Sequence, residues 1–281
     1  MTASPVPLGD TALDLNSEAG LRRVLASIDS MATQRPVAAR IVVATNSDDV
    51  SARELSRLLA TDVALAGRVL KLANSATFAM RGRVDSLQFA VTVVGFTTVR
   101  TMATVALTNL DDESRLPADF WTTTTHLALS AAAVAPRLGQ RAQDALCVGL
   151  LAELGAALLH HVDPEGYRLV LSDLPIPTAR RAAERRRYGI AALDLSAVAL
   201  ERWSFPLTVI TPMQKIDVEG ALDGAVLRVS YEVASRLGNP DHVPRSIVRL
   251  SCGRLSEKDI QSVLRRVQEE ADELRRVILG D

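Results

Sequence analysis

The sequence of 281 residues is poor in cysteine, aromatic side chains and lysine, and the first two shortages each exclude a class of structure. Its two cysteines, Cys147 and Cys252, lie too far apart for a metal knuckle and are too few for a disulfide framework. We expect both to be small buried hydrophobic residues in a reducing compartment. Aromatic residues make up only 4% of the chain, and its one Asp-Gly pair, at 223–224, lacks alternating flanks. Strands and hairpins are therefore not expected.

An excess of one sign of charge is also missing. The chain has 32 Lys and Arg residues against 33 Asp and Glu residues, so its net charge is −1. This balance excludes a global basic field that would attract nucleic acid or an anionic membrane. The sequence offers neither a run of about 18 apolar residues nor the pattern of a signal peptide. We therefore expect no membrane span and a cytoplasmic protein.

Helix signals, in contrast, are dense. Ser51 and Glu54 have the spacing of a capping box, and Ser256 with Asp259 gives a similar start near the C-terminus. Residues 142–161 are apolar on nearly every face, which predicts a buried central helix. These patterns predict an all-α protein with short connections between its helices.

The organisation along the chain is that of one helical unit with weak internal breaks. Residues 1–16 lack periodicity and are expected to be mobile. Breaks near 109–116 and 215–224 divide residues 17–280 into three parts without a linker long enough to separate domains. These parts are an N-terminal lobe at 17–110, a second lobe at 111–215 and the C-terminal helices at 216–281.

A specific resemblance begins at residues 70–76, Leu-Lys-Leu-Ala-Asn-Ser-Ala. Further segments match the same signature in the same order, namely Asp62–Leu65, Ala90–Arg100, Phe120-Trp121, Gly149–Gly155, Glu184 with Gly189, and Glu201–Pro206. Together they resemble the HDOD family, helical bacterial signalling modules related to the HD-type phosphohydrolases. The resemblance covers about residues 20–280, nearly the whole chain.

This resemblance implies an HD-like multi-helix bundle in two helical lobes, with a degenerate HD core at 111–215 and a C-terminal amphipathic helix. HD enzymes hold metal ions with His and Asp side chains, and the metal makes water nucleophilic. The corresponding positions here carry Thr123, Ala152, Glu153, Ala192 and Tyr231. Methyl and hydroxyl groups cannot supply the ligand set of a hard metal. We therefore expect no metal, no cofactor and no catalytic residue.

Two states of this cleft stay open from the sequence. Ala152, Ala192 and Thr123 are small, which would permit a void that a ligand could enter. Alternatively, Glu153 and Tyr231 could fill the space with a hydrogen bond between carboxylate and phenol.

A polar groove between the lobes is the first candidate binding surface. Its candidate residues are Arg68, Lys71, Asn74, Ser75, Arg100 and Glu184. The favoured interpretation of the Asn-Ser pair is structural, since such side chains satisfy loose backbone groups at a helix end. A lining for a partner or ligand is the alternative.

An arginine segment is the second candidate. It contains Arg180, Arg181, Arg185, Arg186 and Arg187. The favoured interpretation is a solvated helix face, supported by the i,i+4 pair of Arg180 and Glu184. The alternative is an anion site for phosphate, nucleotide or nucleic acid, because the guanidinium fork matches phosphate oxygens.

The last helix carries a heptad seam, which is the third candidate. The apolar residues recur at spacings of four and three: Ile260, Leu264, Val267, Ala271, Leu274 and Ile278. Packing on the body of the chain is slightly favoured over a homodimer contact.

The leading functional hypothesis is a non-catalytic signalling or scaffold module that binds a protein partner or a regulatory ligand in trans. Cyclic-dinucleotide, motility or stress signalling is what the family resemblance implies. The alternative is nucleotide or nucleic-acid binding through the arginine segment. The least favoured hypothesis is a residual phosphohydrolase that uses Glu153 and His126.

Overall fold

The structure is a computed structural model of the chain. It describes residues 35–280 apart from 48, 79, 81 and 174–176, together with residues 22, 24 and 26. Every regular element in this described part is a helix, so the predicted all-α class is confirmed. The segment 1–16, expected to be mobile, lies outside the described residues.

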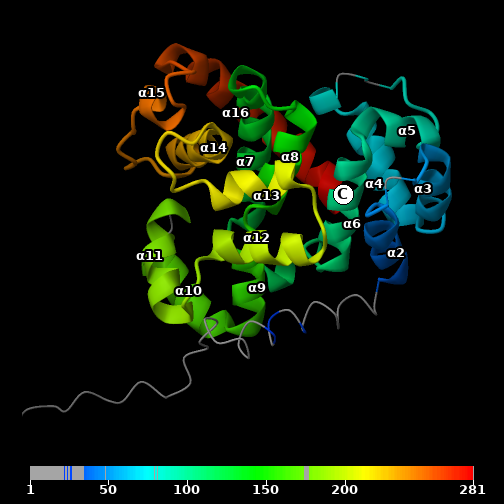
Figure 1. Cartoon of the computed structure of the whole chain (residues 1–281), viewed down its shortest axis with the longest axis horizontal. Coiled ribbons are helices and arrows are strands. Elements are labelled where there is room, and N and C mark those ends of the chain that lie inside the picture. Colours follow the sequence, from blue (N-terminus) through cyan, green and yellow to red (C-terminus); the bar gives the residue numbers. More distant parts are fainter. Residues whose placement is uncertain are drawn as a thin grey trace, which may run out of the picture.

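The N-terminal lobe forms one side of the molecule (Figure 1). It consists of α2 (Pro36–Ala44), α3 (Ala52–Leu59), α4 (Val63–Asn74), η1 (Ala76–Phe78), α5 (Leu87–Val94) and α6 (Phe96–Leu107). Ser51 and Glu54 make the expected reciprocal capping box at the start of α3. The Asp62 side chain caps α4 by accepting a hydrogen bond from the amide of Leu65. Helix α6 is buried from Thr98 to Leu107 and forms the inner wall of this lobe.

The middle of the chain supplies the core helices. These are η2 (Glu113–Arg115), α7 (Phe120–Val134), η3 (Ala135–Leu138), α8 (Ala142–Leu151) and α9 (Leu154–Val162). The central helix expected at 142–161 is thus two helices, broken at Ala152 and Glu153. By length and composition alone, 142–162 would suffice to cross a membrane. In this fold, 83% of its most apolar window is buried within the protein, as in the core of a helical bundle.

The remaining helices cover the other side of this core. They are α10 (Pro164–Asp173), α11 (Pro177–Tyr188), α12 (Ala192–Arg202), α13 (Leu207–Gln214), α14 (Leu222–Gly238), α15 (Ile247–Leu250) and α16 (Glu257–Leu279). Figure 1 shows α10, α11, α14 and α15 on the side opposite to α2–α5, with α7, α8, α12 and α13 in the middle of the view. One continuous apolar cluster runs through both groups, from Val42 in α2 to Ile278 in α16. The lobes therefore share a core.

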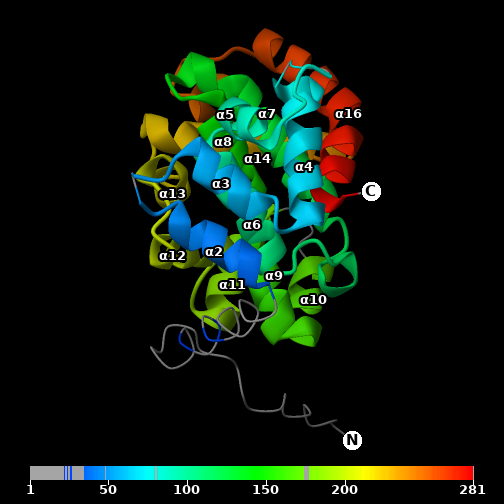
Figure 2. The same ribbon diagram turned by 90° about the vertical axis from the view of Figure 1, so that its right-hand side faces the viewer.

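Helix α16 ties the two sides together. It begins beside α14 and α15, crosses α7 and ends alongside α4, as the turned view in Figure 2 shows. Its seam is fully covered at Ile260, Val267 and Ile278. The heptad spacing is therefore satisfied within the chain, as the favoured interpretation predicts. Helix α16 contacts α7, α14 and α4, and five of the six seam residues are buried within this chain, while Leu264 is partly exposed.

Two glycines let the core helices approach closely. A Cβ atom at Gly149 of α8 would overlap the backbone of Ala128 in α7. A Cβ atom at Gly155 of α9 would overlap the carbonyl of Ala192 in α12. Both glycines belong to the segment 149–155 that carries the family resemblance, so that segment brings α8 close to α7, and α9 close to α12, on either side of Glu153.

Candidate functional site

The break between α8 and α9 places one carboxylate inside the bundle. Glu153 stands at the N-terminus of α9, but its side chain makes no cap and turns into the core, where the residue is 5% exposed. The backbone around it is held by Ser196 of α12, whose hydroxyl accepts from the amide of Gly155 and lies 2.9 Å from the carbonyl oxygen of Ala152. The packing of small residues at this junction thus presents Glu153 to the helices that surround it.

Two side chains from distant segments complete the coordination of Glu153. The phenol of Tyr231, in α14, donates a hydrogen bond to Glu153 Oε1 at 2.8 Å. The guanidinium of Arg180, in α11, donates from Nη2 to Glu153 Oε2 at 2.5 Å. The pairing of Glu153 with Tyr231, one of the two states left open by the sequence, is present in the structure. The guanidinium that completes it was not anticipated.

A second carboxylate lies on the other side of Arg180. Glu184 Oε1 lies 3.5 Å from Nε of Arg180 and accepts a hydrogen bond from the phenol of Tyr167 at 2.8 Å. Glu184 Oε2 accepts from the backbone amide of Ala192 at 2.9 Å. The five residues Glu153, Tyr167, Arg180, Glu184 and Tyr231 are all at most 6% exposed, and we call them the cleft cluster.

Burial and charge set the protonation of the cleft cluster. Burial alone would lower the pKa of Arg180, but the negative charges of Glu153 and Glu184 raise it above its ordinary value. Burial raises the pKa of both Tyr167 and Tyr231, and the nearby carboxylates add to this effect. Burial also raises the pKa of Glu184, and Arg180 opposes that rise. Arg180 is therefore cationic and both phenols are protonated donors at neutral pH.

The residues at the positions that the resemblance aligns with the metal ligands of HD enzymes do not fit a divalent metal ion. Ala152 and Ala192 offer no side-chain donor, and Tyr231 is a protonated phenol that already donates to Glu153. Both oxygens of the one carboxylate at these positions are engaged, one of them with a cationic guanidinium. The described part of the chain also contains no group of three His, Cys, Asp or Glu side chains arranged to hold a metal.

Helix α7 packs closely on α8, because a Cβ atom at Gly149 of α8 would overlap the backbone of Ala128. On α7, Thr123 is partly exposed, whereas Thr124 is fully buried and its hydroxyl has no hydrogen-bond partner within the described residues.

His126 does not approach the cleft cluster as a ligand would. Its side chain is partly buried, which lowers its pKa, and the charged group that acts on it is Asp272 of α16. The hypothesis of a site that uses Glu153 with His126 thus finds its two residues engaged with different helices.

The arginine segment is largely paired rather than free. Arg180 is buried, so it belongs to the cleft cluster and not to a surface patch, and its pair with Glu184 is not solvated. Arg181 and Arg185 both bind Asp194 and Asp217. Arg187 binds Asp163, which also accepts from the Tyr188 phenol. Arg186 is exposed. The signal that could have located Arg180 inside was its spacing to Glu184, interpreted from the sequence as a surface pair.

The residues predicted for a polar groove do not line one surface; most of them make separate contacts near their own positions. Asn74 clamps Val84 by accepting from its amide at 3.0 Å and donating to its carbonyl at 2.8 Å. Ser75 donates to the carbonyl of Leu72, and Arg68 binds Asp111 at 3.0 Å. Lys71 is exposed on α4, and Glu184 belongs to the cleft cluster. These contacts match the structural interpretation of the Asn-Ser pair.

Arg100 connects the lobes. Its guanidinium binds the side-chain oxygen of Asn46 and the carbonyl of Trp203, and it lies 4.3 Å from the ring centroid of Phe205. Burial lowers its pKa to about 10, so it remains charged at neutral pH. Arg100 therefore anchors the corner after α12 to the N-terminal lobe instead of lining an open groove.

An open cavity between the lobes lies elsewhere, beside the loop that follows the Asn-Ser pair. Its volume is about 400 Å³, and its lining is mostly apolar. The loop contributes Phe78 and Met80, α5 contributes Val93, α8 contributes Leu146, and α16 contributes Arg266. None of the six residues predicted for the groove lines this cavity.

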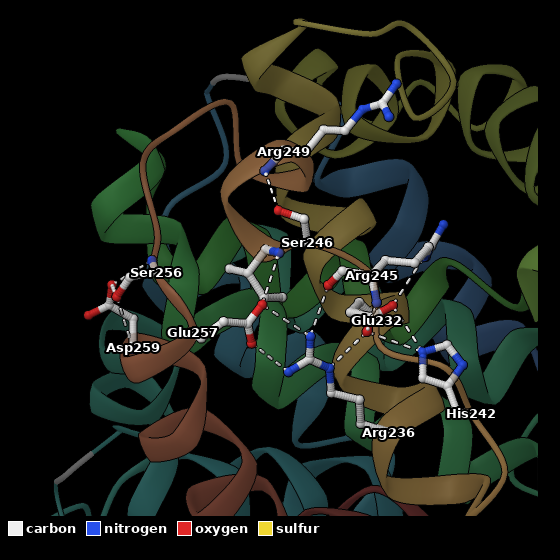
Figure 3. Close-up of polar contacts among 10 residues, drawn as sticks. Glu232, Arg236, His242, Arg245, Ser246, Arg249, Ser256, Glu257 and Asp259 are labelled. Atoms are coloured by element: carbon white, nitrogen blue, oxygen red, sulfur yellow. Dashed lines mark hydrogen bonds and ion pairs between the residues drawn. The ribbon is translucent and has the colours of Figure 1, made fainter.

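A second ionic cluster fixes the C-terminal helices (Figure 3). Glu232 of α14 is fully buried and accepts hydrogen bonds from Arg236 at 2.7 Å and from the backbone amide of Arg245 at 2.9 Å, with His242 at 3.1 Å. Arg236 also binds Glu257 at the start of α16 at 2.8 Å. This cluster joins α14, the loop before α15 and α16 into one unit.

Comparison with known proteins identifies the class of this fold. A structure from Shewanella amazonensis SB2B, named as a candidate phosphohydrolase, superimposes with a TM-score of 0.65 at 20% identity, covering 91% of this chain and 97% of that one. A candidate signal transduction protein from Marinobacter aquaeolei VT8 gives 0.66 at 21% identity, covering 96% and 67%. An HDOD domain protein of unknown function from Geobacter sulfurreducens gives 0.58 at 19% identity, covering 92% and 98%. The fold is thus that of the HD-related helical proteins.

The sequence itself defines the family. Residues 31–217 match the HDOD domain, which is more than half of the chain. This chain belongs to the HDOD family, as its motifs predicted. No curated protein matches it.

Proposed function

We propose that this protein is a non-catalytic signal-transduction module of the HDOD type. The observation that carries the proposal is the cleft cluster, in which the protein's own side chains use both oxygens of Glu153. A metal ion would have to displace a guanidinium and compete with a phenol, while gaining one carboxylate from the positions aligned with the HD metal ligands. Metal-activated water is therefore disfavoured, and the shaped helical surface remains for binding.

The proposed role is to bind a protein partner or a regulatory ligand in trans, within cyclic-dinucleotide, motility or stress signalling. The cavity between the lobes supports a ligand, because about 400 Å³ with an apolar lining and few polar groups suits a small molecule. Nucleic-acid binding through α11 has weaker support, since Arg181, Arg185 and Arg187 already bind carboxylates.

The first test is turnover. Purified protein should hydrolyse neither nucleotides nor cyclic dinucleotides with Mg²⁺ or Mn²⁺ present, and Glu153→Ala should behave in the same way. Metal-dependent hydrolysis that Glu153→Ala abolishes would show that the protein is an enzyme and that the proposal is wrong.

The second test is partner capture from native cell extract, with the wild type beside an Arg185→Glu/Arg186→Glu variant. The proposed scaffold role is supported by a specific protein that is recovered with both forms. Addition of the purified, untagged form of that partner should displace it. Nucleic acid or nucleotide recovered with the wild type alone would instead make α11 the binding site. Salt-dependent release would accompany that outcome, because phosphate contacts weaken steeply with ionic strength.

A further inference from the structure

We propose that Arg180 is a built-in cation: its guanidinium occupies a cation-binding site formed by Glu153 and Glu184 and thereby closes the cleft. This inference rests on the proposed absence of a catalytic metal, and it adds that a guanidinium is the cation held in the cleft. The site would accept a free guanidinium ion when the Arg180 side chain is removed.

The contacts of Arg180 are those of a ligand in a prepared site. Nη2 lies 2.5 Å from Glu153 Oε2, and Nε lies 3.5 Å from Glu184 Oε1. The three side chains are 7%, 6% and 1% exposed, so the interaction is shielded from solvent. A buried ion pair is favourable only with close geometry and satisfied partners. The contact with Glu153 meets the first condition, whereas Nε of Arg180 makes an ion pair with Glu184 but no hydrogen bond within the described residues.

Other groups hold the two carboxylates whether or not Arg180 is present. Tyr231 donates to Glu153, while Tyr167 and the amide of Ala192 donate to Glu184. These donors come from α14, α10 and the start of α12, not from the helix that carries Arg180. Glu153 is likewise fixed from outside α11, at the start of α9. Glu184 lies on α11 with Arg180, so the site combines one carboxylate from α9 and one from α11, and the donors that hold both carboxylates come from other helices.

The charge balance makes a cation necessary. Two carboxylates and one guanidinium share the buried space, so the site with Arg180 carries at most one net negative charge. Without Arg180 it would hold two carboxylates facing each other in a medium of low dielectric constant. One of them must then take up a proton, or a cation must enter. Burial raises the pKa of Glu184, and the charge of Arg180 opposes that rise, so removal of Arg180 would favour the protonated carboxyl further.

The planar shape of the guanidinium points to the class of ligand. Arg180 reaches the two carboxylates from different nitrogen atoms of one planar group, a fork that an ammonium or a spherical ion does not reproduce. The free guanidinium ion has the same plane and the same donors, and truncation of Arg180 leaves a space of matching size.

The experiment is chemical rescue of Arg180→Ala in the full chain, followed by thermal unfolding. Guanidinium chloride is added to about 20 mM, far below the molar concentrations that denature proteins. Binding to the folded state alone should raise the melting temperature of Arg180→Ala by about 2–4 °C when the ion exceeds its dissociation constant tenfold. The same addition should leave the wild type unchanged, as should an equal concentration of NaCl for the variant.

Arg186→Ala is the matched control, because Arg186 lies on the same helix and is exposed. It should melt like the wild type and show no response to guanidinium. Rescue of Arg186→Ala to the same extent would mean a non-specific effect and would overturn the proposal. So would an Arg180→Ala protein that is as stable as wild type, or one that is destabilised and insensitive to guanidinium.

If Arg180→Ala does not fold, the double variant Glu153→Gln/Arg180→Met keeps volume while it removes both charges. The proposal expects this double variant to fold and to melt above Arg180→Met alone, because Glu153→Gln removes one of the two buried carboxylates that the loss of the guanidinium leaves facing each other. Simple additivity of the two single effects would overturn it. Neither unfolding assay measures turnover. Failure of the guanidinium rescue would therefore leave the proposed non-catalytic function standing, and metal-dependent hydrolysis would be detected separately in the turnover test.

Discussion

Helices α11 and α16 dock on the same core by different means. The inner face of α16 is apolar and sealed, with Ile260, Val267 and Ile278 fully buried. The inner face of α11 is ionic: Arg180 enters the core, and Arg181 and Arg187 bind carboxylates at its margin. An apolar face needs only the right spacing, whereas an ionic face needs partners placed by other segments. The stability that the apolar face contributes should therefore change little with salt and acid, whereas the stability that the ionic face contributes depends on both.

The largest effect is expected where the ionic face reaches deepest. Glu153→Ala removes the carboxylate and leaves the buried guanidinium of Arg180 without its closest partner. Breaking a buried pair in this way costs about 3–5 kcal/mol of the free energy of unfolding. Urea denaturation monitored by circular dichroism measures this change. A loss below about 1 kcal/mol, the level of an exposed pair, would contradict the described burial.

The apolar face of α16 should show a similar loss with a different dependence on conditions. Ile278→Ala creates a cavity in a fully buried position and should cost about 2–5 kcal/mol. Because no charge is involved, the loss should be the same from about 0.05 M to about 0.5 M salt. A dimer seam would instead make the effect depend on protein concentration, which sedimentation of both forms would reveal.

Acid should act on the margin of α11 through Asp163. Burial would raise the pKa of Asp163, but bonds from Gly166, Tyr188 and Arg187 hold it below its ordinary value of 3.8. A depressed pKa means that this carboxylate stabilises the fold above pH 3.8, and that the contribution is lost as the pH falls through the lower folded-state value.

Asp163→Asn tests this sign. The variant should be about 1–2 kcal/mol less stable than wild type at pH 7, as expected for loss of charge-assisted hydrogen bonds. The two proteins should begin to converge as the pH falls below about 3.8, and the difference should vanish once the pH passes the lower folded-state pKa of Asp163, where the wild-type carboxyl is neutral as well. Denaturation curves at several pH values measure the difference. A gap that widens in acid would reverse the sign and contradict the assignment.

The smallest effect is expected at the exposed rim of α11. Arg185→Ala removes pairs with Asp194 and Asp217, in which the arginine is 45% exposed. Exposed pairs contribute about 0.2–1 kcal/mol, and added salt should erase the difference from wild type. The comparison is with Arg186→Ala, which should change stability by less than about 0.5 kcal/mol. A larger loss at position 185 would place that side chain in the network that holds α11.

The same contrast explains how far the sequence could predict this structure. The period of α16 identified Ile260 and Ile278 as buried, because periodicity is local information. The capping box of Ser51 and Glu54 was equally visible. The partner of Arg180 was not, since Glu153 lies 27 positions away and meets it only through tertiary packing.

Only one contact of the cleft cluster, between Glu153 and Tyr231, was predictable from the sequence. Alignment of motifs brought Glu153 and Tyr231 together although they are 78 positions apart, and the structure contains that hydrogen bond. Tyr167 and Arg180 belong to no matching motif. The one signal at Arg180, its spacing to Glu184, is equally typical of an exposed pair on a helix, so it did not show that the side chain points inward.

The path of α16 also sets an order of events during synthesis. The faces of α4 and α7 that it covers are complete more than a hundred residues before α16 is made. At ribosomal rates of about 5–20 residues per second, those faces wait on the order of ten seconds for their cover. The nascent N-terminal lobe therefore presents an apolar strip for that interval, which chaperones can bind before the final helix is complete.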